Sequence, residues 1–425
     1  MSLPPSVKEH TRKKNQSIWS NQKFNAYLGS VTFSSAGFLM QQLIISWILV
    51  GILVLPGDEV GIIQATIAIP GLFLMLWGGT LADQSDPRTL LVRVHFIAWI
   101  FPLLFLAWNQ IFGLSIAAIL FYGLTISTAT SFSSPAHQAI LNSIAGRDLQ
   151  KAVTASTAVT FLVQMLSLGF AGQMQNIGLP LILVVQSACI LIGACLLLRL
   201  NKSPPMQRKS ESAIAQLISG FRATYRNRDV SHLFLINFLS SVFNAGAFFT
   251  VVPFIVHRIY EGEAMQLATV LIIFFLGATV TNLTLFKIMP ITSPGKWYLC
   301  MQVSRVAILY LLWIEPDWWL FMLAMFAWGM NMGFTTTLSR TIVQESAEPE
   351  YRGRILSVYS LGLIGSAPIG ALILGNIIEI FGTLNALLPA MLISIILFCY
   401  GCFWTPIWRY ESPKQENRIL NKNSV

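Results

Sequence analysis

Long apolar runs, separated by polar stretches, occupy most of the chain. A helix needs roughly 20 mostly apolar residues to cross a hydrocarbon core about 30 Å thick. The runs that meet this length predict twelve membrane spans, at residues 27–54, 60–82, 90–108, 111–134, 152–174, 178–199, 231–256, 264–289, 297–314, 318–344, 354–378 and 383–405. We therefore expect an all-α, polytopic membrane protein with twelve transmembrane helices.

Only one polar interval is long, and it divides the chain near its midpoint. Residues 200–230 begin with a Pro- and Ser-rich run and continue with the amphipathic stretch AIAQLISGFRATYRNRD. The second part favours either a helix at the inner membrane surface or a simple tether. The division predicts two pseudo-symmetric six-helix bundles, at 1–199 and 231–425, joined by a cytoplasmic loop. Weak internal matches at an offset of 206 residues, such as Tyr122-Gly123 with Trp328-Gly329, support this repeat.

Composition and charge agree with a membrane protein and orient it. Hydrophobic residues make up 55% of the chain and charged residues 11%, against about 25% charged residues in a soluble domain. Lys and Arg gather in the tails, in residues 200–230 and in alternate loops, whereas the loops of the other side carry a single basic residue, Arg258. Positively charged loops face the cytoplasm, so we expect both termini inside, in the plasma (bacterial inner) membrane. The net charge of +9 is then spread over cytoplasmic loops, and no soluble face gathers it for nucleic acid.

The loop after the second span carries the strongest motif. Its residues Gly78-Gly79-Thr80-Leu81-Ala82-Asp83-Gln84-Ser85-Asp86-Pro87-Arg88 are similar to the G-x-L-A-D-R-x-G-R-R loop of the major facilitator superfamily, with Asp in place of the second Gly. Three further segments resemble that superfamily's exporter branch, which includes the enterobactin exporter and macrolide-efflux-type permeases. These are Met40-Gln41-Gln42 with Trp47, SPAHQA at 134–139 with GRDL at 146–149, and EPEYRGR at 348–354. The resemblance implies secondary transport by alternating access between two six-helix halves.

The chain departs from the family pattern in two places. Gln84 stands where the family has a basic residue after the Asp, which removes one charge from the cytoplasmic loop. In the fifth span, residues 167–172 read SLGFAG and lack the Pro that drug/proton antiporters often carry. The second departure weakens an assignment to those antiporters.

The resemblance also implies a latch at the cytoplasmic ends of the helices. Asp83 is implied to contact the start of the eleventh span, near Arg352 and Arg354, and so to hold the two halves together. The alternative is a carboxylate at a helix end in water. The residues assigned to gating are Gly79, Asp83, Asp86, Arg88, Arg352 and Arg354.

Arg305 is the most informative single residue. It lies nine residues past Lys296, so that a rise of 1.5 Å per residue puts it roughly 13 Å into the membrane. A charge at that depth costs at least about 2.5 kcal/mol on insertion scales, and it should face the interior or a wet cavity. Either it attracts an anion or gates the path, or it holds the ninth span to its neighbours through hydrogen bonds.

The resemblance implies a central cavity lined by the first, fourth, seventh and tenth spans. The candidate cavity residues are Gln41, Gln42, Thr125, Ser127, Ser131, Asn237, Asn244, Arg305, Trp328 and Asn331. Uncharged polar groups among aromatic side chains suit an amphipathic organic molecule better than a sugar or a bare ion. For any single residue of this set, helix packing is the alternative.

Several kinds of chemistry are missing from the sequence. All 18 acidic residues lie in tails, loops or span ends, so a proton-coupled mechanism has no mid-membrane carboxylate to use, and His95 is the nearest substitute. A G-x-x-x-x-G-K-[ST] loop does not occur, so we expect no ATP and no cofactor. The five cysteines lie in apolar segments and are expected to pack as small hydrophobes rather than to hold a metal.

These observations predict a permease that exports an amphipathic small molecule, such as a siderophore or a hydrophobic drug. An uptake permease, or a lipid or lysolipid flippase of the same fold, is the alternative. A membrane receptor or a membrane enzyme is disfavoured, because no reactive cluster occurs at membrane depth. The expected partners are the substrate and the bilayer, and a coupling proton or other ion is left open.

Overall fold

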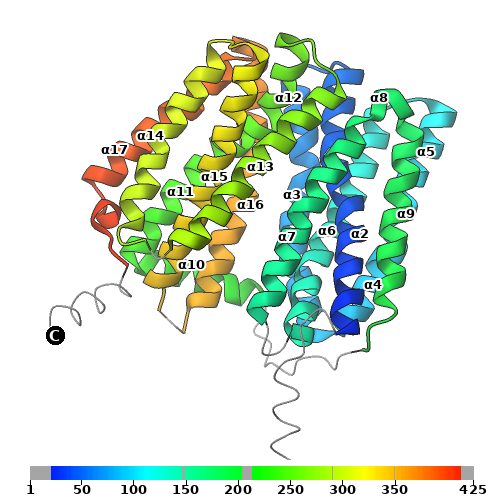
Figure 1. Ribbon diagram of the computed structural model, residues 1–425, viewed down its shortest axis with the longest axis horizontal. Coiled ribbons are helices and arrows are strands. Elements are labelled where there is room, and N and C mark those ends of the chain that lie inside the picture. Colours follow the sequence, from blue (N-terminus) through cyan, green and yellow to red (C-terminus); the bar gives the residue numbers. More distant parts are fainter. Residues whose placement is uncertain (1–20, 146–148, 203–212, 290, 349, 413–425) are drawn as a thin grey trace, which may run out of the picture.

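The computed structural model describes residues 21–145, 149–202, 213–289, 291–348 and 350–412, and within them the regular elements are all helices (Figure 1). The basic tails at 1–20 and 413–425 and the Pro- and Ser-rich run at 203–212 lie outside this part of the chain. The expectation of an all-α fold is therefore confirmed for the described residues.

The first half of the chain forms six long helical rods, two of them made of successive elements. In chain order they are α2 (Gln22–Trp47) continued by η3 (Ile48–Ile52), α3 (Gly57–Gln84), α4 (Pro87–Ala98) followed by α5 (Ile100–Phe112), α6 (Ile116–Ala145), α7 (Leu149–Gly172) and α9 (Leu179–Leu197). The short helix α8 (Met174–Ile177) lies between the last two rods.

The second half repeats this plan after one additional helix. That helix, α10, spans Ala213–Arg226. The rods that follow are α11 (Arg228–Gly246) continued by η5 (Ala247–Val251), α12 (Val252–Phe254) and η6 (Ile255–Ile259), then α13 (Ala264–Ile288), α14 (Pro294–Trp313), α15 (Trp318–Ser346), α16 (Arg352–Phe381), and η7 (Asn385–Leu387) continued by α17 (Leu388–Phe403). A 3-10 turn, η8 (Pro406–Arg409), closes the described chain.

Ten of these rods are long and apolar enough to cross a membrane. The other two described rods, α14 and α15, do not reach the same apolar composition, because polar residues such as Arg305 and Asn331 interrupt them. These ten rods identify an integral membrane protein. That α14 and α15 also cross the membrane stays a prediction.

The helix ends follow local sequence signals. The side chains of Asn21, Asp86, Asn227 and Asp317 each accept a hydrogen bond from a backbone N–H of the first turn of the helix that follows, as N-cap residues do. The fourth span was expected at 111–134 but begins at Ile116, because Gly113, with a φ of 77°, ends α5 there. It also runs on to Ala145, past the expected end at residue 134.

The π-helical segments η3, η5 and η6 were not expected. They widen the first rod of each half near the same end of the bundle. A π turn adds one residue per turn, and a continuous apolar run contains no periodic signal that would reveal it.

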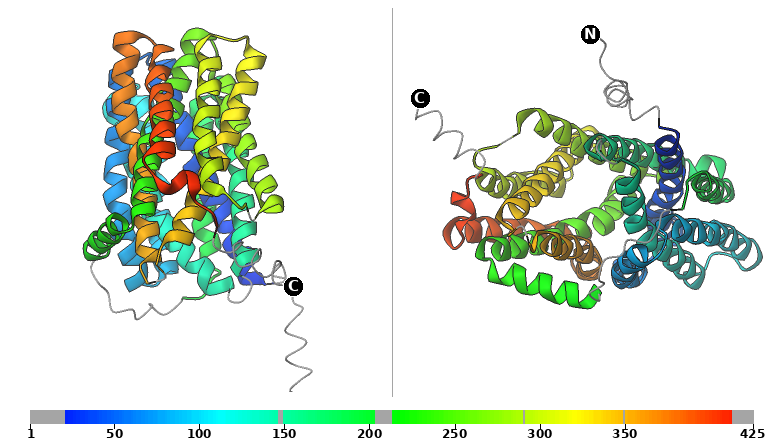
Figure 2. Two further views of the ribbon diagram at one scale, coloured as in Figure 1. Left: turned by 90° about the vertical axis from the view of Figure 1, so that its left-hand side faces the viewer. Right: turned by 90° about the horizontal axis from the view of Figure 1, so that it is seen from below.

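The rods stand side by side (Figure 2), and two pairs of helices form the main contacts between the halves. Within the first half α2 packs on α6, α7 and α9, and within the second half α11 packs on α16 and α17. Between the halves, α3 packs on α16 and α7 packs on α13. We call the end with residues 53–56, 260–263 and 382–384 the upper end, as in Figure 1, and the opposite end the lower end.

Helix α10 occupies the lower end of the bundle. It packs against α11, α16 and the end of α3, and it lies crosswise to the rods when the bundle is seen from below (Figure 2). The second part of the 200–230 interval is therefore a docked helix rather than a simple tether. That this helix lies on the inner membrane surface stays a prediction.

Candidate functional site

At the upper end the backbones of the two halves touch. A Cβ atom on Gly61 would lie 2.4 Å from the carbonyl oxygen of Ala371, and one on Gly375 would lie 2.4 Å from the carbonyl oxygen of Gly57. The backbone N–H of Gly57 also donates to a carboxylate oxygen of Glu379 at 3.2 Å. Small residues permit this close approach of membrane helices, so any side chain larger than hydrogen would force α3 and α16 apart.

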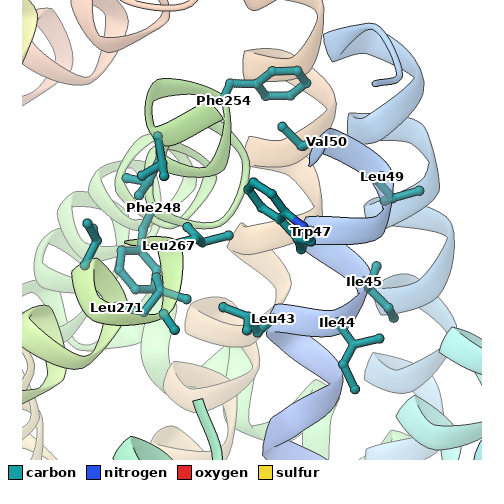
Figure 3. Packing of buried hydrophobic residues seen from close by; sticks show 14 of the residues in the cluster. Leu43, Ile44, Ile45, Trp47, Leu49, Val50, Phe248, Phe254, Leu267 and Leu271 are labelled. Carbon is teal, nitrogen blue, oxygen red and sulfur yellow. The ribbon is translucent and has the colours of Figure 1, made fainter. Parts of the chain in front are cut away.

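A buried apolar cluster surrounds this joint and contains residues of both halves. In Figure 3 the ring of Trp47 points from α2 toward Leu267 and Phe254 of the second half. Trp47 is 2% exposed, and its ring meets that of His257 edge-on at 5.6 Å. The upper end of the bundle is thus packed with side chains contributed by both halves.

A polar bridge lies among the residues of this apolar cluster. The Gln64 side chain of α3 donates to the backbone carbonyl of Phe249 at 3.3 Å and accepts from the Thr250 hydroxyl at 2.7 Å. Thr250 is fully buried. Two neutral hydrogen bonds therefore accompany the apolar contacts between the halves.

Arg305 lies at the centre of a buried hydrogen-bond network in the second half. It is 5% exposed. Its Nε and one terminal nitrogen donate to Oδ1 of Asn331 at 3.1 and 2.9 Å, and the other terminal nitrogen donates to Oε1 of Gln302 at 3.0 Å and to the hydroxyl of Ser240. The guanidinium thereby joins α14 to α15 and α11. All four of these hydrogen bonds end on neutral oxygens.

The residues around Arg305 hold one another in place but leave two groups without partners. The amide nitrogen of Asn331 donates to the Met301 carbonyl and to the Ser304 hydroxyl, both at 2.7 Å. The amide nitrogen of Asn244 donates to the backbone carbonyl of Ser240 at 2.7 Å. Among the described residues, Nε2 of Gln302 and Oδ1 of Asn244 are buried without a hydrogen-bond partner. One donor and one acceptor are therefore open beside a buried positive charge.

Sequence reasoning identified part of this network and missed the rest. Arg305, Asn331, Asn237 and Asn244 were candidates, and Asn237 joins the network's edge by accepting from the Tyr298 hydroxyl at 3.5 Å. Ser240 and Gln302 were missed. Gln302 precedes Arg305 by three residues on the same helix, a spacing that puts both on one face and was therefore available as a signal.

The other cavity candidates are engaged in helix packing. Gln41 donates to the Gly123 carbonyl at 2.9 Å, and the hydroxyls of Ser127 and Ser131 lie 2.9 and 3.0 Å from where a Cβ on Gly71 would stand. Thr125 donates back to the Phe121 carbonyl of its own helix at 2.9 Å.

Two further candidates lie apart from the Arg305 network. Trp328 is 2% exposed, and its ring centroid lies 6.1 Å from that of Phe248 and 5.8 Å from that of Phe274. It therefore belongs to the apolar cluster. Gln42 is half-buried on α2. A role for these residues in a cavity stays a prediction.

At the lower end the predicted gating residues make contacts near their own helices. Asp86 caps α4 by accepting from the backbone N–H and the hydroxyl of Thr89, at 3.1 and 2.5 Å. Arg88 donates to the carbonyls of Leu197 and Leu198 at the end of α9, at 3.2 and 3.1 Å. Both residues thus stabilise the lower end of the first half.

The arginines of α16 contact the segments beside them. Arg354 donates to the Ser219 hydroxyl of α10 at 3.0 Å, and Arg352 donates to the Ala347 carbonyl at 3.4 Å. Gly79 and Asp83 lie in the last turns of α3, and their surroundings are outside the described part of the chain. A contact of Asp83 with these arginines stays a prediction.

A cavity of about 1080 Å³ lies at the lower end between α10, α11 and the start of α16. Charged side chains of both signs line it, namely Arg222, Arg226, Arg228, Asp229, Glu348, Glu350 and Arg354. In the described residues no three His, Cys, Asp or Glu side chains come together as a metal site requires.

Comparison with known proteins identifies the family. Residues 17–418 match the family of transmembrane secretion effectors of the major facilitator superfamily. The chain is 20% identical over 334 residues to the staphyloferrin A transporter of Staphylococcus aureus (strain NCTC 8325 / PS 47), a match that covers 76% of this chain and 81% of that protein.

Solved structures of transporters share the fold. A point mutant of the nucleoside transporter NupG superposes with a TM-score of 0.77 at 15% identity, covering 90% of this chain and 99% of that one. The xylose transporter XylE from E. coli in an inward open conformation gives a TM-score of 0.65 at 14% identity, covering 93% and 97%. Both the family and the fold are those of transporters rather than enzymes. The chain belongs to the transmembrane secretion effector family of the major facilitator superfamily and is an integral membrane transporter.

Proposed function

We propose that this transporter exports an amphipathic small molecule, such as a siderophore or a hydrophobic drug, by alternating access. One observation carries the proposal: apolar side chains and glycine backbones of both halves jointly close the upper end of the bundle. A carrier that opens alternately must close each end with contacts that it can break again. Apolar packing, close backbone approach and a few neutral hydrogen bonds meet that requirement better than buried ion pairs, whose separation leaves uncompensated charges.

In this proposal the moving bodies are the two six-helix bundles, residues 1–199 and 231–425, with both termini in the cytoplasm. The lower end is then the cytoplasmic end, and the upper end faces out of the bacterial inner membrane. The latch of Asp83 with Arg352 and Arg354 closes the lower end when the upper end opens. Docking of α10 on α16, and the bond from Arg354 to Ser219, support a role for α10 in that closure.

The substrate site is proposed beside the Arg305 network. The guanidinium of Arg305 carries a positive charge and bonds only to neutral oxygens among the described residues, so no negative charge offsets it there. It therefore favours an anionic or strongly electronegative group nearby. The open donor of Gln302 and the open acceptor of Asn244 offer two further polar contacts. A siderophore combines such groups with apolar surface, and the staphyloferrin A transporter, a relative at 20% identity, supports that class.

Inverted membrane vesicles test this function. Vesicles that contain the protein should take up at least one molecule from a panel of staphyloferrin A, enterobactin and ethidium, and vesicles from cells without the protein should not. Uptake by right-side-out vesicles alone would reassign the direction to import. Movement of labelled lysolipid between leaflets, without movement of any panel molecule, would replace export by the flippase alternative.

A further inference from the structure

Four rods of the first half enclose a cavity of about 440 Å³. It lies between the starts of α2 and α4, the end of α6 and the segment that follows α9, all at the lower end of the bundle in Figure 1. We call it the basic cavity, because every charged residue in its described lining is a cation. These residues are Lys23, Arg88 and Lys202. The described lining therefore contains no carboxylate that could neutralise them.

The basic cavity combines an apolar interior with a charged mouth. Ile140 and Leu200 line it and are each only 5% exposed, and Ile144 is half-buried. Lys23 and Lys202, by contrast, are exposed. A lysine keeps its ammonium group in water while its stem covers apolar surface. A ligand that carries both an anionic group and hydrocarbon therefore matches this lining.

Arg88 is held in place before any ligand arrives. Its Nε and one terminal nitrogen donate to the carbonyls of Leu197 and Leu198 at 3.2 and 3.1 Å. The other N–H groups of the guanidinium remain for an external acceptor. Because two bonds already fix the fork, little conformational freedom is lost when a ligand binds. A guanidinium in this state suits phosphate, which it can bind through two parallel hydrogen bonds.

The equivalent place in the second half has a different balance of charge. The larger cavity beside α10 shares three lining positions with the basic cavity at the offset of 206 residues that relates the two halves. The equivalent residues are Asn21 and Asn227, which cap α2 and α11, Lys23 and Asp229, and Ile144 and Glu350. Acids thus stand where the basic cavity has a lysine and an isoleucine. The uncompensated positive charge is therefore specific to the first half and not common to the whole lower end.

We propose that the basic cavity binds a phosphate group of net negative charge, which bonds to Arg88 and is attracted by the ammonium groups of Lys23 and Lys202. Cations that share a cavity repel one another, and a bound anion removes that repulsion. Basic pockets between membrane helices on the cytoplasmic side bind phospholipid head groups in this way. The bound group would join the lower ends of α2, α4, α6 and α9.

An anionic phospholipid and free inorganic phosphate both supply such a group, and the surroundings favour the lipid. Leu198, whose carbonyl binds Arg88, is 49% exposed, so an apolar side chain is available to an acyl chain beside the charged mouth. The volume of about 440 Å³ lies within the range of about 300–1,000 Å³ that is usual for organic ligands. That the lipid belongs to the cytoplasmic leaflet rests on the proposed orientation of the bundle, whereas binding itself does not.

Native mass spectrometry of the full chain in detergent tests the site, with phosphatidylglycerol and phosphatidylcholine of the same acyl chains as probes. The wild type should bind one phosphatidylglycerol at least about tenfold more tightly than phosphatidylcholine, whose head group has no net charge. The double variant Lys23→Gln/Lys202→Gln should lose this preference. Arg222→Gln/Arg226→Gln is the matched control, because it removes the same charge from exposed residues of the second-half cavity, and it should keep the preference.

Inorganic phosphate separates the two sources of the group. If it raises the thermal unfolding temperature of the wild type but not of Lys23→Gln/Lys202→Gln, and the wild type does not prefer phosphatidylglycerol, the site stands and its ligand is free phosphate. Equal weakening of phosphatidylglycerol binding in both double variants would reveal a general attraction to positive charge and overturn the proposal. Equal binding of the two lipids by the wild type, without any effect of phosphate, would overturn it as well. Neither measurement depends on transport, so both outcomes leave the proposed function untouched.

Discussion

The two halves of the chain bury different kinds of polar cluster at comparable positions. In each half the cluster joins the first, third and fourth rods. These are α2, α4 and α6 around the neighbouring rings of His95 and His137, whose centroids lie 5.6 Å apart, and α11, α14 and α15 around Arg305. The serines on the first rods, Ser34 and Ser240, are related by the same offset of 206 residues as Tyr122 and Trp328. One helix plan therefore accommodates a neutral, titratable pair in one half and a permanent charge in the other.

This difference in charge predicts a difference in what each cluster does. A guanidinium stays protonated at any ordinary pH, so Arg305 needs its hydrogen-bond acceptors throughout that range. Its network should therefore contribute to the stability of the folded protein. The histidine pair is neutral, and its serines are already bonded to their own helices. Loss of the pair should therefore cost less stability than loss of Arg305.

Arg305→Leu should give the largest effect. It leaves Oδ1 of Asn331 buried without its donor and removes a donor from Gln302 and from Ser240, whose bond to each other remains. An unsatisfied buried group costs about 1–3 kcal/mol. We expect a loss of about 3–5 kcal/mol of stability, measured as a lower thermal unfolding temperature in detergent, together with loss of transport.

Arg305→Lys separates the charge from the geometry at this site. Lysine keeps the charge but cannot reproduce the fork of the guanidinium, so it should recover part of the stability. An Arg305→Leu protein that melts at the wild-type temperature would contradict the contrast between the two clusters.

Gly375→Val should come next, and it tests the joint between the halves while leaving both clusters intact. The new side chain would meet the Gly57 carbonyl at 2.4 Å, and overpacking of this kind costs about 1–3 kcal/mol. We expect transport in the vesicle assay to fall at least about tenfold. Gly365→Ala on the same helix is the control, because its Cβ would find only Leu72, at an ordinary 3.6 Å. Equal transport by both variants would show that the glycine contact is dispensable.

Ser240→Ala and Ser34→Ala form the most direct comparison, since the two serines occupy equivalent positions. Ser240→Ala removes an acceptor of the guanidinium, and a hydrogen bond to a charged group contributes about 1.5–3 kcal/mol. Ser34→Ala removes a 3.5 Å contact to His137 and should lower stability by less than about 1 kcal/mol. Thermal unfolding of the two variants side by side measures the difference, and the reverse order would remove the distinction between a charged and a neutral cluster.

Asp83→Asn should have the smallest effect on stability, because the proposed latch closes the lower end only when the upper end opens. We expect normal amounts of folded protein in the membrane and turnover slowed about tenfold, which corresponds to about 1.4 kcal/mol. Asp86→Asn removes the same charge three residues away while Asn can still cap α4. Equal slowing in both variants would assign the effect to the charge of the loop rather than to a latch.

The apolar runs predicted the fold well, because length and apolarity alone decide whether a helix can span a membrane. Arg305 was also predictable, since a charge nine residues inside a span must find partners. Its partners were not: Ser240 lies 65 residues away, and helices that are apolar on every face give no pattern to show which face meets a neighbour. The same physical reason hid His137 as the partner of His95, 42 residues earlier in the chain. The π-helical segments stayed hidden because an apolar run looks the same in either helical form.

The glycine contact between α3 and α16 has a consequence for repeated operation. The carbonyls of Gly57 and Ala371 that face the opposite helix belong to the helical ladders of α3 and α16, whose own amides bind them along the axis. When the helices part, water meets main-chain carbonyls whose bonding needs are already fulfilled, and it replaces Glu379 at the Gly57 N–H. What is lost is mainly dispersion attraction between two smooth surfaces. Such a seam can separate and reseal many times without stranding a polar atom.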